Sequence, residues 1–229
     1  LFKRVRRNLF SFTISKNRSQ IDWRRFFNLM GKIITALESQ KRNPDRLNVY
    51  LNGEFAFGIS KFVGAWLSVG QSIDEKKIET LLRQDEREKA LQVALRYINY
   101  RQRTSKEVQD KLTDASFPSE IIEDVVAELK EKGYINDKDY ASQWAEMRSA
   151  FKPRSHYLIA LELKKKGVGE DVISEALKEV PNDKTLAIQF GMNYMRKLKN
   201  VDEKTFMKKM HMALRRKGFS YSLINEVMD

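Results

Sequence analysis

LKKKGVGEDVISEA, residues 163–176, decides the fold because the same pattern occurs three times along the chain. It aligns without gaps with LTDASFPSEIIEDV at 112–125 and with LRRKGFSYSLINEV at 214–227. The copies begin at Leu112, Leu163 and Leu214, which are 51 residues apart both times. Equal spacing and matched turn chemistry indicate an internal repeat rather than a chance likeness among amphipathic helices.

Each copy combines the end of one helix, a tight turn and the start of a second helix. The turn residue is Ser116, Gly167 or Gly218, and glycine suits the left-handed backbone of such a turn. A further helix is predicted before each copy, over 86–99, 137–150 and 183–198. We therefore predict three modules of three helices, at 85–135, 136–180 and 181–229. One helix pair cannot bury its apolar face alone, so the modules are expected to stack into an elongated array.

A small antiparallel β unit is predicted before the modules, within residues 30–84. The runs IITALES, LNVYL and EFAFGI have strand character, and Asn52-Gly53 between the last two is a strong hairpin signal. A helix over 60–68 or over 74–83, the second capped by Asp74, is expected to pack on this sheet. The predicted fold class is thus mainly α, with tandem three-helix modules and a small N-terminal sheet.

Composition excludes several classes of site. The chain has no cysteine, which excludes disulfides and thiolate catalysis, and only two histidines, His156 and His211, which excludes a multi-histidine metal site within one chain. There is no Gly-Lys-Ser/Thr phosphate loop and no carboxylate–base arrangement for hydrolysis. No apolar run approaches the length of a transmembrane helix. We expect a cytoplasmic protein that is not an enzyme and has no cofactor.

The net charge of +12 is concentrated at the N-terminus, because residues 1–29 hold eight Lys/Arg and one acid and so contribute +7. This basic, aromatic-rich segment loosely fits an organellar presequence or a helix on a membrane surface. Met30-Gly31-Lys32 opens a more ordinary sequence. Our hypothesis is that Met30 is the functional start and that residues 1–29 are a non-native or dispensable extension.

Residues 85–229 resemble the RecX family, regulators of the bacterial recombinase RecA. The resemblance is carried by an ordered set of stretches, at 94–108, 111–112, 121–129, 133–141 and 161–168. The stretch KRNPDRLNVYLNGEFAFG at 41–58 is similar to the extra sheet-bearing segment of longer members. One departure lies at Lys152-Pro153-Arg154, where members often have glycine before the proline and closely spaced basic residues after it. A basic contact there is expected to be weaker in this chain.

The resemblance implies a regulator without catalytic activity. RecX-like proteins bind the RecA–single-stranded DNA filament, lie along its groove, and restrain its growth, ATPase and strand exchange in recombination and repair. Separate modules could contact successive protomers, so that weak contacts add through effective concentration. The chain is expected to act as a monomer.

Basic residues at helix starts and turns are the candidate contacts to RecA or to DNA phosphate. They are Arg101, Arg103, Lys106, Lys111, Lys152, Arg154, Lys164, Lys165, Lys166, Arg215, Arg216 and Lys217. The same charges also fit a solvated helix face, or a cationic last turn that complements the helix dipole. Each rim charge is worth about 1 kcal/mol or less, so single substitutions should act weakly and clusters strongly.

Two other functions are compatible with these residues. A direct DNA-binding or architectural protein would use the same basic edge on single- or double-stranded DNA, with an affinity that falls steeply with salt. A helical-repeat scaffold for another protein would affect neither RecA nor DNA.

Overall fold

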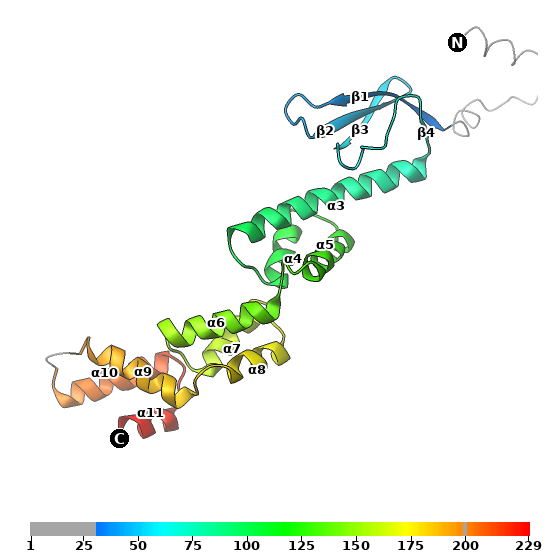
Figure 1. Cartoon of the computed structure of the whole chain (residues 1–229). Coiled ribbons are helices and arrows are strands. Elements are labelled where there is room, and N and C mark those ends of the chain that lie inside the picture. The colour runs from blue at the N-terminus through cyan, green and yellow to red at the C-terminus, as the bar shows by residue number, and fades with distance from the viewer. Residues whose placement is uncertain (1–30, 199–200) are drawn as a thin grey trace, which may run out of the picture. The chain divides into compact units, whose positions relative to one another are not determined.

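The computed structural model describes residues 31–198 and 201–229, and the chain divides into two compact units, Leu1–Arg83 and Gln84–Asp229. A small antiparallel sheet lies in the first unit, and tandem helices make up the second (Figure 1). The fold class is therefore mainly α with tandem three-helix modules, as predicted. The predictions for residues 1–29 and for Met30 lie outside the described residues.

Over the described residues, the sheet has four antiparallel strands in the order β3-β2-β1-β4. Their bounds are Lys32–Ser39 for β1, Arg46–Leu51 for β2, Glu54–Ser60 for β3 and Ser72–Ile73 for β4. Asn52 and Gly53 join β2 to β3 with φ angles of 52° and 91°, the positive values that a tight hairpin turn requires. Strand β4, which the sequence pattern does not predict, pairs with Lys32 and Ile33 at the start of β1.

The helix that covers this sheet is α3 (Glu75–Tyr100), whose Ile78 and Leu81 join the buried core of the sheet. Asp74 caps it, since its Oδ1 accepts a hydrogen bond from the amide of Lys77 at 2.7 Å. The alternative prediction of a helix over 60–68 is wrong, because 61–66 forms turns. So short a segment has little helical stability of its own, and its shape is set by packing of Val63 into the same core.

Helix α3 is also longer than predicted. The sequence pattern suggests separate helices over 74–83 and 86–99, whereas the chain is helical without a break from Glu75 to Tyr100. No glycine or proline occurs in these 26 residues, so nothing in the backbone chemistry ends the first helix.

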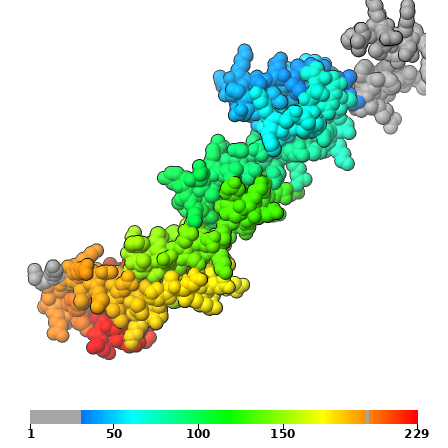
Figure 2. All heavy atoms as spheres, viewed as in Figure 1, coloured from blue at the N-terminus to red at the C-terminus, as the bar shows by residue number. Residues whose placement is uncertain are grey.

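Eight further helices follow α3 among the residues of the second unit that the structure describes. They are α4 (Ser105–Asp114), α5 (Ser119–Glu131), α6 (Asp137–Phe151), α7 (His156–Lys165), α8 (Glu170–Lys178), α9 (Asp183–Met195), α10 (Glu203–Arg216) and α11 (Tyr221–Met228). Leu112, Leu163 and Leu214 are each fully buried, and each belongs to a different hydrophobic core. Figure 2 shows the last three helices, coloured orange to red, packed against one another.

The predicted turn geometry is present in all three copies. Ser116, Gly167 and Gly218 have φ angles of 62°, 77° and 83°, in the left-handed region. At the start of α4, Thr104 and Glu107 form the predicted capping box, in which each side chain accepts from the other residue's backbone amide. Local sequence chemistry thus accounts for the start of α4 and for the turn between the paired helices of each copy.

Candidate partner-binding site at the module junctions

Neighbouring modules meet through a contact between repeat-equivalent positions, although the donor group differs between the two junctions. Thr104 Oγ1 donates to the carbonyl of Lys166 at 2.6 Å, and the amide of Ser155 donates to the carbonyl of Lys217 at 2.9 Å. Thr104 and Ser155 are repeat equivalents, as are Lys166 and Lys217. Both capping residues are fully buried. The turn of each later module therefore sits on the N-cap of the middle helix in the module before it.

A second contact at each junction involves the start of that same helix. The first amide of α4, from Ser105, donates to Asp137 Oδ1 at 2.8 Å, and the first amide of α7, from His156, donates to Asp183 Oδ1 at 2.7 Å. Asp137 and Asp183 are the first residues of α6 and α9. Amides in a first helical turn have no partner within their own helix, so the next module supplies one.

Glycine at the docked turn is required on two grounds. Besides the positive φ, a Cβ on Gly167 would lie 2.3 Å from Cβ of Lys106, and one on Gly218 would lie 2.5 Å from Oγ of Ser155. Such distances exclude any side chain without movement of the junction. Ser116, at the same position in the first module, is solvent-exposed, which explains why a serine is tolerated there.

The first junction, where the second module docks on α4, contains a carboxylate that is shared by two cations. Glu107 accepts from Arg101 and from Lys166, each at 3.0 Å. Burial acts to raise the pKa of the Glu107 carboxyl, but the hydrogen bonds from Arg101 and Lys166 outweigh it and hold that pKa below its usual value. Arg103 stacks over the ring of Tyr97 at 3.8 Å. Lys166 thus joins the two modules through Glu107, while Nε of Arg103 is buried without a hydrogen-bond partner in the described chain.

The second junction, where the third module docks on α7, lacks that carboxylate. The repeat equivalent of Glu107 is Leu158. Lys217 lies 5.3 Å over the ring of Phe190, and in the part of the chain that the structure describes it has no carboxylate partner. Burial lowers the pKa of the Lys217 ammonium, and the nearby cations lower it further.

We call the cations around this lysine the cationic junction: Arg148, Lys152, Arg154, Arg216 and Lys217. One carboxylate, that of Glu162, is ion-paired within this group in the described residues. It accepts from Arg148 Nε at 2.7 Å and from Arg154. Nε of Arg154 is buried and has no hydrogen-bond partner in the described chain. Arg148 and Arg154 share Glu162, and no ion pair is formed by Lys152, Arg216 or Lys217 within the described residues, so this group is suited to an anionic partner.

The structure separates the sequence-predicted site residues into three groups. Arg101, Arg103, Lys106 and Lys166 lie at the first junction, and Lys152, Arg154, Arg216 and Lys217 lie in the cationic junction. Lys111, Lys164, Lys165 and Arg215 lie on exposed surfaces. Arg148 joins the cationic junction although sequence reasoning missed it. Its spacing of four residues before Lys152, at the end of a predicted helix, is the signal that could have identified it.

The two histidines are engaged separately. Nε2 of His156 lies 2.8 Å from the carbonyl oxygen of Pro181, and the ring of His211 packs edge-on against Tyr221. Within 31–198 and 201–229, the structure contains no group of three or more His, Asp or Glu side chains placed to hold a metal ion. Nor does any helix among those residues have the length and apolar character to cross a membrane.

Comparison with known protein families identifies domains that match three parts of this chain. Residues 32–74 match the N-terminal domain of regulatory protein RecX, residues 90–129 match the first three-helix domain of RecX, and residues 136–177 match the second. This chain belongs to the RecX family. The predicted family is confirmed, and the sheet and the first two modules correspond to separately recognised RecX domains.

Individual RecX proteins agree with this assignment. The chain is 32% identical to regulatory protein RecX of Bacillus pumilus (strain SAFR-032) over 200 residues, which cover 86% of this chain and 76% of that protein. It is 32% identical to regulatory protein RecX of Clostridium botulinum (strain Alaska E43 / Type E3) over 201 residues, covering 85% and 94%. The family is thus one of regulatory proteins by name.

Solved RecX structures share the fold. A crystal structure of regulatory protein RecX aligns with a TM-score of 0.68 at 29% identity, over 86% of this chain and 99% of that one. The crystal structure of RecX from Lactobacillus salivarius aligns with a TM-score of 0.56 at 26% identity, over 63% of this chain and 96% of that one.

Proposed function

We propose that this protein is a non-enzymatic regulator of the recombinase RecA. It binds the RecA–single-stranded DNA filament in the cytoplasm, as a monomer, and restrains filament growth, ATPase and strand exchange in DNA recombination and repair. Membership of the RecX family supports a regulatory role. We also propose the domain boundaries. The sheet-bearing unit spans 30–84, and the three modules span 85–135, 136–180 and 181–229.

The observation that carries the proposal is the recurrence of one module junction at a constant sequence spacing. Thr104 and Ser155 each donate to the carbonyl of the repeat-equivalent lysine of the next module, through a hydroxyl at the first junction and a backbone amide at the second. A chain of equivalent modules presents related surfaces at regular intervals, which suits a polymer of identical protomers better than a single small ligand. The cationic junction supplies charge for recombinase carboxylates or DNA phosphates.

The test is a titration of this protein into RecA on single-stranded DNA. We expect ATPase and strand exchange to fall at substoichiometric to equimolar amounts. The double variant Lys152→Glu/Arg216→Glu reverses two exposed charges of the cationic junction and should weaken the effect. Lys178→Glu/Lys197→Glu is the matched control, because it makes the same charge change at exposed positions outside the junction. Unchanged RecA activity at a clear excess of wild-type protein would overturn the proposal.

A second candidate is direct DNA binding, which the cationic junction also favours. Phosphate contacts release condensed counterions, so affinity for DNA would fall steeply with salt in the absence of RecA. Anisotropy of a labelled oligonucleotide at low and high salt separates the two functions. Tight, salt-sensitive binding together with unchanged RecA activity would favour the DNA-binding function.

A further inference from the structure

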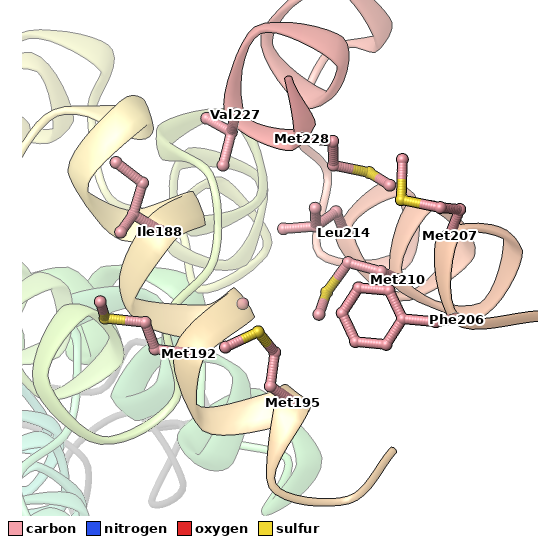
Figure 3. Close-up of a pocket in the computed structure, with 10 residues that line it drawn as sticks. Ile188, Met192, Met195, Phe206, Met207, Met210, Leu214, Val227 and Met228 are labelled. Carbon is pink, nitrogen blue, oxygen red and sulfur yellow. The ribbon is translucent and has the colours of Figure 1, made fainter. Parts of the chain in front are cut away.

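The third module contains an apolar groove between α9, α10 and α11, apart from the cationic junction. Its volume is about 240 Å3. Five of the chain's eight methionines line it: Met192, Met195, Met207, Met210 and Met228. In Figure 3, Met192 and Met195 of α9 stand on one side and Phe206, Met207 and Met210 of α10 on the other, with Met228 of α11 near the top of the groove.

The α9 wall of the groove is exposed rather than part of the core. Ile188, Met192 and Met195 are 40%, 63% and 48% exposed, and their spacing places them along one helix face. Contiguous exposed apolar surface of this kind commonly marks a site of interaction with another molecule. Methionine is flexible and polarisable, so a methionine-lined groove can adapt to side chains of differing shape.

The dimensions of the groove favour a partner side chain over a small-molecule ligand. Sites for drug-sized ligands have volumes of about 300–1,000 Å3, whereas an apolar cavity of about 150 Å3 holds a single benzene ring. A groove of about 240 Å3 therefore has room for only a few apolar groups. An amphipathic helix that lays its apolar face between other helices presents such groups one turn apart.

The charge around the groove indicates which charge the polar face of a docking partner helix carries. Residues 181–229 include ten Lys/Arg and five Asp/Glu, and without Arg216 and Lys217 of the cationic junction their net charge is +3. Lys204 and Lys209 are exposed, and Lys204 lies three residues before Met207 whereas Lys209 lies three residues after Phe206, so helical spacing places one lysine beside each edge of the lining face of α10. Charge complementarity selects an acidic helix, and it disfavours the chain's own 1–29 segment, which is also basic.

We propose that this groove is a docking site for an acidic amphipathic helix of a partner protein. Apolar side chains of the partner enter between Met192 and Met210, and its carboxylates face Lys204 and Lys209. The site goes beyond the proposed regulation of RecA and does not depend on it, because neither the groove nor its flanking lysines belong to the cationic junction.

The test uses the full chain and a fluorescent synthetic helix with leucine and phenylalanine along one face and glutamate elsewhere. Anisotropy should show binding that weakens with salt, and a matched peptide with lysine in place of glutamate should bind at least about tenfold more weakly. The ε-methyl NMR signals of Met192, Met195 and Met210 should shift on binding, while that of Met147 on α6 should not. No binding of the acidic peptide, or equal binding of both peptides, would overturn the proposal.

The variants change exposed side chains, so that a loss of peptide binding reports on the groove and not on a failure to fold. Met192→Glu should weaken peptide binding at least about tenfold, because a carboxylate would enter an apolar contact. Met192→Leu should preserve it. Met212→Glu is the matched control, since Met212 is 53% exposed on α10 but does not line the groove. Equal loss in Met192→Glu and Met212→Glu would contradict the assignment, as would unchanged affinity in Met192→Glu.

Two further experiments on the same protein test for other occupants of the groove. Light scattering that shows a dimer abolished by Met192→Glu would assign the groove to a second copy of the chain and overturn the proposal. A gain of more than about tenfold in peptide affinity on deletion of residues 1–29 would assign it to that segment, with the same consequence. A monomer with unchanged affinity after the deletion supports the acidic partner helix.

Discussion

Lys166 donates a hydrogen bond to Glu107 across the first module junction, with Nζ and Oε1 3.0 Å apart. The repeat equivalents of these residues at the second junction are Lys217 and Leu158, where the pair is absent. The two junctions therefore share their repeat positions but differ in whether a carboxylate faces the lysine. At the first junction Glu107 is shared by two cations, whereas at the second Lys217 has no carboxylate partner among the described residues.

Leu158→Glu should convert the second junction to the pairing of the first. The new carboxylate would face Lys217, raise the pKa of its ammonium, and reduce the net charge of the cationic junction. We expect the variant to restrain RecA less than wild type. Leu158→Gln has nearly the same shape without the charge and is the control for lost apolar packing. Equal activity of the two variants would show that the charge of this junction has no part in regulation.

Glu107→Gln should destabilise the protein in a pH-dependent way. The pKa of Glu107 is lower in the folded chain than its ordinary value of 4.5. Such a carboxylate adds stability that is present above the ordinary value and is lost as the pH falls through the folded pKa. The Tm difference between wild type and Glu107→Gln should thus be largest at neutral pH and shrink in acid.

Glu170→Gln serves as the control for that measurement. Glu170 also pairs with a lysine, Lys164, at 2.7 Å, but both side chains are largely exposed. Exposed pairs contribute little, so its Tm should stay close to wild type at every pH. A pH-independent Tm difference for Glu107→Gln would rule out the proposed ionic role of Glu107.

Three glycine substitutions separate backbone strain from the docking contact. Gly133, Gly167 and Gly218 all have positive φ, but only the last two face another module at short range. Gly133→Ala should cost about 1 kcal/mol in free energy of unfolding, from backbone strain alone. Gly167→Ala and Gly218→Ala should cost about 2–4 kcal/mol, because the added Cβ meets Lys106 or Ser155.

Urea unfolding of the full chain measures these differences. The denaturant slope should be compared as well, since modules that separate before they unfold would broaden the transition. Equal costs for all three substitutions would mean that the turns do not dock as described.

Asp137→Ala and Asp183→Ala should each remove a cap supplied by the neighbouring module. Each carboxylate accepts from the first amide of the preceding module's middle helix, at 2.8 and 2.7 Å. Loss of a helix cap costs about 1 kcal/mol. Asp171, exposed in the first turn of α8, is the control, and Asp171→Ala should change stability by less than about 0.5 kcal/mol. A comparable loss in all three variants would argue against capping between modules.

Features determined by neighbouring residues were predictable from the sequence. The left-handed turns at Gly167 and Gly218, the capping box at Thr104 and the hairpin at Asn52-Gly53 all depend on the chemistry of a few adjacent side chains. The 51-residue repeat depends only on counting along the chain. Each was therefore visible before any contact was known, and together they were enough to predict tandem helical modules and a small sheet.

Features that join distant residues were decided only in three dimensions. Strand β4 exists because Ile73 pairs with Lys32, and residues 61–66 are not helical because Val63 packs into the core of the sheet. Likewise, the predicted basic residues divide between a junction where Glu107 pairs with two of them and a junction where Lys217 has no carboxylate partner among the described residues, according to which carboxylates the fold brings near them. The sequence by itself determined the repeating unit, since turns and caps are local. The tertiary structure alone decided which charges remain available, since electrostatic pairing depends on distance in space rather than along the chain.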